Sequence, residues 1–242
     1  MQLTKQILFE DEDFIVINKP AGLLSIPDRH NDKLASLSGL LEQRFGKIFI
    51  VHRLDKDTSG TIVFAKNEAT HQFLSGQFQQ QKTTKIYWGL ATGRIFEKEG
   101  TIEAPIYESS VKRGKMLTGK KGKPARTTFE VLESFSLYTL LKLRIFTGRT
   151  HQIRVHLQSI GHPVAMDEVY GNGSPFYLSL IKRKYRIGKF QEEEKPLMSR
   201  MALHALSLSF DDKKGQRLTF EAPLPRDFQA VLHQLRKHAL IQ

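Results

Sequence analysis

One run of nine residues, His52-Arg53-Leu54-Asp55-Lys56-Asp57-Thr58-Ser59-Gly60, and the apolar stretch Thr61-Ile62-Val63-Phe64-Ala65 behind it constrain this chain most. Such an apolar stretch predicts a buried strand, so the polar turn before it is held rigidly at the edge of a sheet. The last four residues of the run are ordinary turn formers, because short polar side chains bond nearby backbone and glycine adopts positive φ. Asp55 precedes them between two cations, which a generic turn does not require. We therefore expect a chemical role for Asp55.

The remaining hydrophobic pattern mixes hairpins with helices and does not alternate them strictly, which argues against a doubly wound parallel sheet. Helical periodicity is clearest near the C-terminus, where Phe228, Val231, Leu232 and Leu235 recur at i, i+3, i+4 and i+7. Further helices are predicted at 36–45, at 67–81 with Asn67 as cap, and after a Thr150 cap up to Gly161. Strands are predicted at 84–93, 127–134, 138–146, 203–210 and 217–220, with two more in 3–18. The pattern predicts a single α+β domain over residues 1–242.

The charge balance points to a polyanionic partner. The chain has 37 Lys and Arg against 25 Asp and Glu, a net charge of +12, and a field of that sign attracts nucleic acid. Residues 109–129 form a predicted basic hairpin without an acidic residue, which is either a solvated tip or a contact for RNA phosphates. Its cations are Lys112, Arg113, Lys115, Lys120, Lys121, Lys123 and Arg126.

Composition also narrows the compartment and the cofactors. The chain has no cysteine, so disulfides and thiolate metal sites are excluded. No apolar run is long enough to span a bilayer and no signal peptide precedes the first strand, so a cytoplasmic protein without membrane partner is expected. His151 and His156 are five apart and would share a helix face poorly. We expect neither a metal nor another cofactor.

The nine-residue run closely resembles the signature of the RluA-type pseudouridine synthases, which isomerise uridine in ribosomal and transfer RNA. Further segments resemble that family's motifs in the family's order: 14–23 the first motif, Lys85-Ile86-Tyr87 the tyrosine strand, 148–156 the third motif and 202–205 a later block. The resemblance covers almost the whole chain. It implies a mixed, mostly antiparallel sheet with flanking helices and a catalytic cleft across it.

The implied reaction breaks the bond from ribose C1′ to base N1 and rejoins the base through C5. It needs a carboxylate near C1′, as in glycoside chemistry, and Asp55 is our candidate. Asp55 acts either as a nucleophile or in a glycal-type path. By resemblance, Arg154 supplies a cation that keeps this carboxylate ionised, and Tyr87 stacks on the target base.

The resemblance also implies substrate-binding residues. Arg53 fills the gap that the flipped uridine leaves, and Ile153 packs beside the base. Lys85 and His52 complete the set, and His52 and His204 are also expected to hold loops by hydrogen bonds. Because flipping costs least at an unpaired base, RNA loops are the expected targets.

The chain departs from the family pattern in two places. No basic, S4-like helical module precedes the first motif, so substrate selection is expected from 109–129 or from a polar, mobile insertion at about 175–195. In Val164-Ala165-Met166-Asp167, Met stands where relatives usually have Gly before the acid, and we expect local repacking there.

Two other classes of function compete with an active RNA isomerase. One is an RNA chaperone that has lost catalysis, which the presence of Asp55, Tyr87 and Arg154 disfavours. The other is a glycosidase or nucleoside hydrolase using Asp55 with Asp57. Two acids that close in a tight turn are poorly placed to flank one sugar, and a small sugar substrate does not explain the net charge of +12. The substrate is either large-subunit ribosomal RNA or a transfer RNA stem-loop, and a monomer with no obligatory protein partner is expected.

Overall fold

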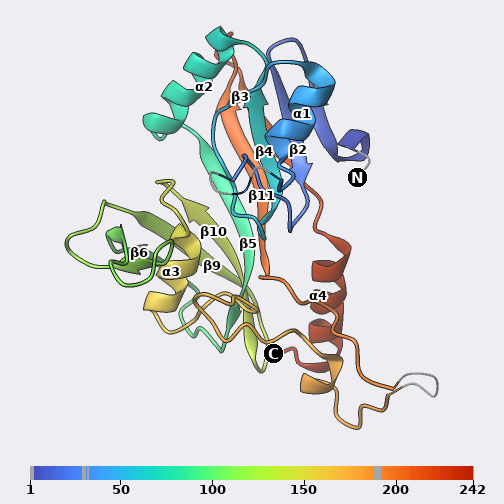
Figure 1. Ribbon diagram of the computed structural model, residues 1–242. Coiled ribbons are helices and arrows are strands. Elements are labelled where there is room, and N and C mark those ends of the chain that lie inside the picture. Colours follow the sequence, from blue (N-terminus) through green and yellow to red (C-terminus); the bar gives the residue numbers. More distant parts are fainter. Residues whose placement is uncertain (1–2, 29–30, 32, 188–191, 242) are drawn as a thin grey trace. The chain divides into compact units, whose positions relative to one another are not determined.

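The computed structural model describes residues 3–28, 31, 33–187 and 192–241, which divide into two compact units (Figure 1). The first unit comprises Met1–Tyr87 and His204–Pro223, and the second comprises Trp88–Leu203 and Leu224–Gln242. Each unit therefore combines segments that are distant in the sequence. The prediction of one catalytic domain over 1–242 concerns both units together and stays a prediction. In the described part of the chain, every helix is too short or too polar to cross a membrane.

The sheet of the first unit has the order β1-β2-β4-β11, with β3 paired to β4 and β12 paired to β11. All these pairings are antiparallel except that of β4 with β11, which is parallel. The strands are β1 (Ile7–Glu10), β2 (Phe14–Lys19), β3 (Phe49–Ile50), β4 (Ser59–Ala65), β11 (Leu203–Asp211) and β12 (Arg217–Glu221), and a 3₁₀-helix, η1 (Leu3–Gln6), precedes them. Every residue of β4 is buried, which confirms the buried strand predicted after the nine-residue run.

The two helices of the first unit begin as their sequences predict. In α1 (Leu37–Phe45), Oγ of Ser36 accepts a hydrogen bond from the N–H of Gly39, and Gly46 ends the helix at φ 77°. In α2 (Glu68–Gln79), the side chain of Asn67 accepts from the N–H of Thr70. Helix α2 packs on β3 and β4, and Leu74 joins the apolar core that Phe14, Val63 and Phe210 form. The predicted cap at Asn67 is therefore confirmed.

In the second unit, β9 (Arg126–Ser134) pairs antiparallel with β10 (Tyr138–Ile145) on one side and with β6 (Glu99–Glu103) on the other. Strand β5 (Thr84–Thr92) carries the chain from the first unit into the second. A separate hairpin joins β7 (Ile106–Glu108) to β8 (Met116–Thr118). The other elements are α3 (Gln152–Ser159), η2 (Leu178–Leu180) and α4 (Arg226–His238). The predicted apolar face of α4 is buried in the core of this unit, and the α+β class is confirmed.

The structure corrects three sequence-based expectations. The N-cap position of α3 is His151, at φ 54° in the left-handed conformation, and not Thr150; the His151 side chain forms no capping hydrogen bond. The turn before α3 is held instead by the side chain of Gln152, whose Oε1 accepts from Oγ1 of Thr147 at 2.7 Å and from the N–H of Arg149 at 3.1 Å. Strand β6 was not predicted, because Ile102 is its one buried residue. The segment 109–129 is not one hairpin tip, because β8 and the start of β9 lie within it.

The predicted polar insertion at 175–195 is anchored at its start. Phe176 is fully buried, and its backbone exchanges hydrogen bonds with Leu197 and Met198. Its ring lies 5.6 Å from that of Tyr138. The expectation of a mobile insertion is therefore wrong for Phe176, and residues 188–191 of the insertion lie outside the described residues.

Candidate functional site

The loop that carries Asp55 is tied down from beneath by buried polar groups of the first unit. Nζ of Lys19, a fully buried side chain, donates to the carbonyl oxygens of Lys56 at 2.9 Å, Leu23 at 2.7 Å and Pro20 at 3.0 Å. Oγ of Ser25 donates to the carbonyl of Leu54 and accepts from its N–H. These bonds fix the backbone on both sides of Asp55, as a rigid catalytic site requires.

The C-terminal end of the nine-residue run is held by β11. Gly60 adopts φ +116°, and a Cβ at this position would lie 2.1 Å from the carbonyl oxygen of Ala205, so only glycine fits. The buried imidazole of His204 accepts from Oγ of Ser59 at 2.9 Å, and its Nε2 donates to the carbonyl of Ala222 at 3.1 Å. The expected hydrogen-bonding role of His204 is thus confirmed.

Tyr87 lies close enough to Asp55 to interact with it electrostatically. Its side chain is 8% exposed. Burial first, and the negative charge of Asp55 second, raise the pKa of the Tyr87 phenol above its usual value. The phenol is therefore protonated at neutral pH beside the carboxylate, and it is a hydrogen-bond donor in this state.

His52 lies against Lys85 and Phe78 in the same unit. Its ring stacks on that of Phe78 with 4.6 Å between centroids, and Nε2 accepts from the N–H of Val63 at 3.2 Å. Burial, then the charge of Lys85, lowers the pKa of His52 to about 3. His52 is therefore a neutral imidazole that ties the run to β4, which confirms its expected role in holding a loop.

Two other predicted binding residues differ in exposure. Arg53 is exposed beside Asp55, whereas Ile153 is 5% exposed on α3 of the second unit. The binding roles of Arg53, Ile153, His52 and Lys85 stay predictions.

In the second unit, Arg154 forms a buried, two-bond ion pair with Asp167. Nε donates to Oδ2 at 2.7 Å and one terminal nitrogen donates to Oδ1 at 2.9 Å. Burial acts to raise the pKa of Asp167, but the hydrogen bonds and charge of Arg154 hold it below its usual range. The guanidinium also lies 5.0 Å from the ring centroid of Tyr170. Asp167 stands out in the sequence only as the acid after Met166, and its role in orienting Arg154 was not predicted.

The residue before this acid explains the departure from the family pattern. Met166 has φ 62°, a left-handed conformation that glycine adopts without strain. Its side chain is 3% exposed and belongs to the core of the second unit. Local packing therefore differs as expected: the Met166 side chain is buried, on a backbone conformation that suits glycine.

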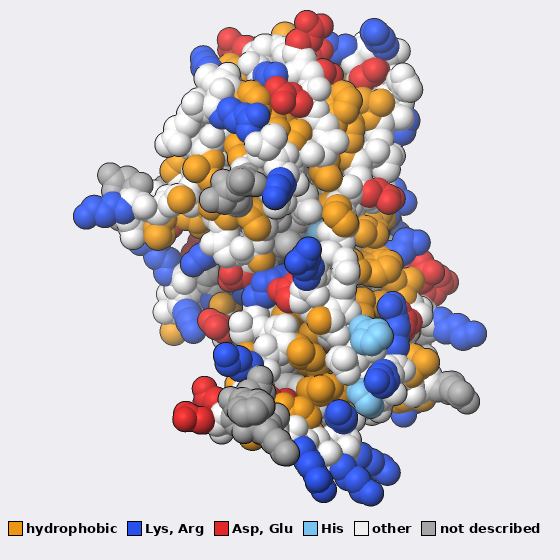
Figure 2. Space-filling view, turned by 90° about the vertical axis from the view of Figure 1, so that its right-hand side faces the viewer, with side chains coloured by type: hydrophobic (Ala, Val, Ile, Leu, Met, Phe, Trp, Pro, Cys, Tyr) orange, Lys and Arg blue, Asp and Glu red, His pale blue; other side chains and the backbone are white. Residues whose placement is uncertain are grey.

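The predicted RNA-backbone cations stand mostly at the surface. All of them are exposed except Lys115, which is half-buried. Nζ of Lys121 lies 4.2 Å from the ring centroid of Tyr107, and Arg126 pairs with Glu103 at 3.2 Å. Figure 2 shows Lys and Arg side chains scattered over one face, among hydrophobic and acidic groups. Their contact with RNA stays a prediction.

The histidines considered for a metal site have protein partners. Nδ1 of His151 lies 3.0 Å from the hydroxyl of Tyr170, and both ring nitrogens of His156 are bonded, to Thr127 and to the carbonyl of Ala104. Within the described residues, no cluster of three or more His, Asp or Glu side chains could hold a metal ion.

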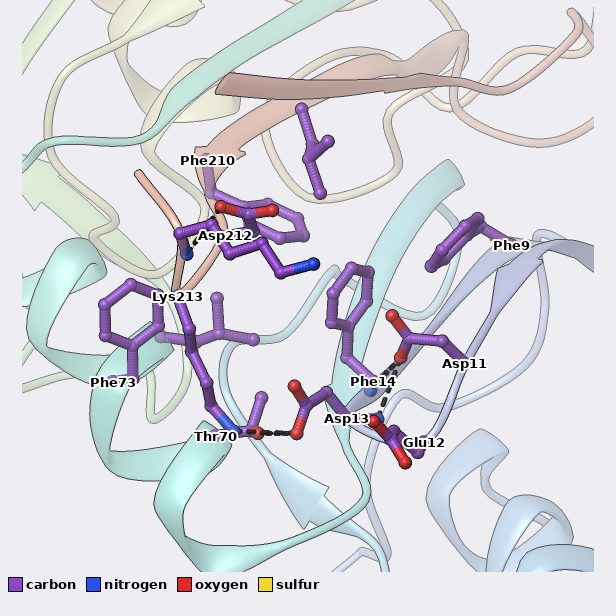
Figure 3. A pocket seen from close by; sticks show the side chains of 13 residues that line it. Phe9, Asp11, Glu12, Asp13, Phe14, Thr70, Phe73, Phe210, Asp212 and Lys213 are labelled. Atoms are coloured by element: carbon purple, nitrogen blue, oxygen red, sulfur yellow. Dashed lines mark hydrogen bonds and ion pairs between the residues drawn. The ribbon is translucent and has the colours of Figure 1, made fainter. Parts of the chain in front are cut away.

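A cavity of about 540 Å³ in the first unit lies between α2 and strands of the sheet (Figure 3). Aromatic rings of Phe9, Phe14, Phe73 and Phe210 line it. Four carboxylates and two lysines also line it, and Nζ of Lys213 reaches Asp13 at 2.7 Å. This lining carries a net negative charge, so it does not suit an RNA backbone.

Known proteins match the chain over nearly its whole length. Residues 13–159 match the family described as RNA pseudouridylate synthase. Ribosomal large subunit pseudouridine synthase D of Nitrosomonas europaea is 41% identical over 237 residues, which cover 96% of this chain and 65% of that protein. The protein of that name from Pseudomonas aeruginosa is 38% identical, over 96% of this chain and 72% of that protein.

Solved structures agree with these relatives. Human RNA pseudouridylate synthase domain containing 4 superposes with a TM-score of 0.73 at 26% identity, over 99% of this chain and 95% of that one. The chain spans about two thirds of the length of the Nitrosomonas relative, at 65%. With a family match over residues 13–159 and these relatives, the chain belongs to the RNA pseudouridylate synthase family.

Proposed function

We propose that this protein isomerises specific uridines in RNA to pseudouridine, with Asp55 as the catalytic carboxylate. The observation that carries the proposal is the electrostatic interaction of Asp55 with a protonated Tyr87 at the end of a fixed loop. The substrate that the relatives' names favour is large-subunit ribosomal RNA, and a transfer RNA stem-loop is the other candidate.

The chemistry requires two bond changes at one carbon. The bond from C1′ to N1 breaks and a bond from C1′ to C5 forms, while C5 loses a proton and N1 gains one. Asp55 supplies negative charge at C1′, where positive charge develops as the first bond breaks. Tyr87 supplies an aromatic ring for stacking on the base, and its hydroxyl supplies a hydrogen-bond donor. No step changes an oxidation state.

Arg154 contributes from the second unit. Its ion pair with Asp167 engages Nε and one terminal nitrogen, which orients the guanidinium. We propose that Arg154 keeps Asp55 ionised when RNA is bound, because a nearby cation lowers the pKa of a carboxylate. Arg53 takes the place of the flipped uridine, and the surface cations of 109–129 bind phosphates.

The test is to map pseudouridines in the RNA of the source cell with the gene intact, deleted, or restored as a variant. The matched pair is Asp55→Asn and Asp57→Asn, since both acids lie in the same loop and Asp57 is exposed. One or a few sites are expected to vanish on deletion and to return with the intact gene and with Asp57→Asn, but not with Asp55→Asn. Restoration by Asp55→Asn would refute the assigned role of Asp55.

If no cellular site changes, an assay with purified protein distinguishes a protein that lacks the activity from one whose activity another enzyme duplicates in the cell. Incubation with unmodified ribosomal and transfer RNA transcripts is expected to give pseudouridine without any added cofactor. If no transcript is modified and no cellular site changes, the proposed activity is wrong.

A further inference from the structure

Lys85 is a buried lysine that lacks a hydrogen-bond acceptor in the described part of the chain. The residue is 7% exposed, and within the described residues no carboxylate or carbonyl oxygen accepts from its Nζ. The contrast is Lys19, which is fully buried and donates to three carbonyl oxygens. Because an unpaired buried cation is costly, a side chain such as Lys85 points to a partner from outside the chain.

Within the described residues, Lys85 forms no ion pair. Its Nζ lies 5.6 Å from the ring centroid of Phe78, and it also interacts with the neutral ring of His52. Burial lowers the pKa of Lys85 to about 8, with no carboxylate to offset that effect. The amine is therefore mostly protonated at neutral pH and still lacks a counter-ion.

The amine also keeps some contact with solvent. Among the described residues, the one fully enclosed side-chain nitrogen or oxygen without a partner is Oγ1 of Thr83. Nζ of Lys85, which no described oxygen accepts from, is not enclosed in this way, so its solvent-facing side is where an anion would approach. The unpaired Thr83 hydroxyl, two residues earlier in the chain, adds a second polar group without a partner.

Lys85 lies on the face of β5 that carries Tyr87. Side chains two apart on a strand point the same way and are separated by roughly 7 Å, and burial alternates accordingly through this segment. Tyr87 in turn interacts with Asp55. Lys85 therefore shares its face of β5 with the residue that interacts with the carboxylate, and a nucleotide joins its phosphate to its glycosidic carbon through a few bonds.

We infer that the ammonium group of Lys85 binds the phosphate next to the uridine that is isomerised, and so anchors the flipped nucleotide beside Asp55. This inference rests on the proposed function. Phosphate fits because it is the anion that every RNA substrate brings. The apolar wall of Phe78 and the neutral imidazole strengthen the ion pair, since they keep the local dielectric low.

The experiment compares Lys85→Met, Lys85→Arg and the exposed control Lys82→Met. The probe is a synthetic stem-loop around the uridine that the mapping identifies, made with each flanking phosphate in turn replaced by a neutral methylphosphonate. RNA affinity, kcat and KM are measured for every pair of protein and RNA. Met is apolar and similar in volume to Lys, so Lys85→Met is expected to fold, and its thermal unfolding checks this.

Lys85→Met is expected to weaken RNA binding roughly tenfold or more, as for loss of a hydrogen bond between charged groups. One methylphosphonate position should weaken binding to the wild-type protein by a similar factor, and it should have little effect on Lys85→Met. Lys85→Arg should retain most of the affinity, and Lys82→Met should resemble the wild type.

Two results would overturn the inference. One is equal sensitivity of the wild type and Lys85→Met to every methylphosphonate. The other is an unchanged RNA affinity of Lys85→Met with a lower kcat, because the amine would then act on the reaction and not on binding. A comparison of uridine 5′- and 3′-monophosphates with uridine gives a readout independent of activity. Lys85-dependent preference for one of the monophosphates would support the phosphate contact even if no RNA were isomerised.

Discussion

Nζ of Lys19 donates a hydrogen bond of 2.9 Å to the carbonyl oxygen of Lys56, directly after Asp55 in the sequence. The two residues lie 37 positions apart, and the same ammonium group holds the carbonyls of Pro20 and Leu23. A buried charge thus joins the end of β2 to the loop that carries Asp55. The geometry of Asp55 therefore depends on a residue that has no part in the proposed chemistry.

Replacement of this lysine should loosen the loop. Lys19→Met leaves three buried carbonyls without their donor, so we expect the free energy of unfolding to fall by about 3 kcal/mol. Urea unfolding measures this, with the exposed Lys33→Met as control. We also expect Lys19→Met to isomerise RNA more slowly at a temperature where Lys19→Met and Lys33→Met are both folded. Loss of folded protein then cannot account for the decrease. Wild-type stability in Lys19→Met would contradict this account of the loop.

The phenol of Tyr87 should stay protonated far into the alkaline range. Burial and Asp55 raise its pKa in the folded state above the unfolded value of 10.0. Below that value both states hold the proton, so stability is unaffected. As the pH rises above it, the unfolded state loses the proton first and the protein loses stability. Asp55→Asn should lower the pKa of Tyr87 without restoring it fully, because the burial remains. Titration of the tyrosine ring signals by NMR tests both statements, and an unchanged pKa in Asp55→Asn would show that the two groups do not interact.

The Arg154–Asp167 pair should contribute more to the free energy of unfolding than a similar pair elsewhere in the same unit. Arg200 and Asp227 form the same two bonds at 2.7 Å and 2.9 Å. The side chain of Asp167 is fully buried, whereas that of Asp227 is 33% exposed. Asp167→Asn is expected to lower the free energy of unfolding by about 3–5 kcal/mol, as for breaking a buried pair. Asp227→Asn is expected to lower it by about 1 kcal/mol or less.

The Asp167 pair also has a predicted pH dependence. The folded state holds the pKa of Asp167 below its usual value, so its stabilising effect is present above that value and is lost as the pH falls through the folded pKa. Between pH 7 and pH 3, the free energy of unfolding measured by chemical denaturation should fall less in Asp167→Asn than in the wild type. Equal pH dependence would contradict the assignment.

Local patterns were enough for much of the fold. The strand after the nine-residue run, the caps at Ser36 and Asn67 and the apolar face of α4 all follow from residues close together in the sequence. Long-range pairings were not readable in this way. Strand β6 depends on β9, and the bond from Ser59 to His204 spans 145 positions. The division into units that each combine distant segments has no local signal either.

For the site, sequence supplied the residue types but not their partners. Motif positions single out Asp55, Tyr87 and Arg154. The bond from Lys19 that holds the Asp55 loop and the ion pair of Arg154 with Asp167 appear only once the chain is folded. The same holds for Lys85. Its burial, and the lack of an acceptor for its Nζ among the described residues, follow from the packing of β5 and cannot be read from the motif.

Met166 offers a test of how this chain accommodates a family glycine position. Its φ of 62° costs a non-glycine residue roughly 1–2 kcal/mol, while its buried side chain stabilises the core. Met166→Ala should lose about 2–5 kcal/mol, since it removes the side chain and keeps the strain. Met166→Gly removes the same side chain but relieves the strain, so it should be about 1 kcal/mol more stable than Met166→Ala, the reverse of the usual order. Urea unfolding of the three proteins separates the two effects. If Met166→Gly were the less stable of the two variants, the backbone at this position would not carry the strain that its φ implies.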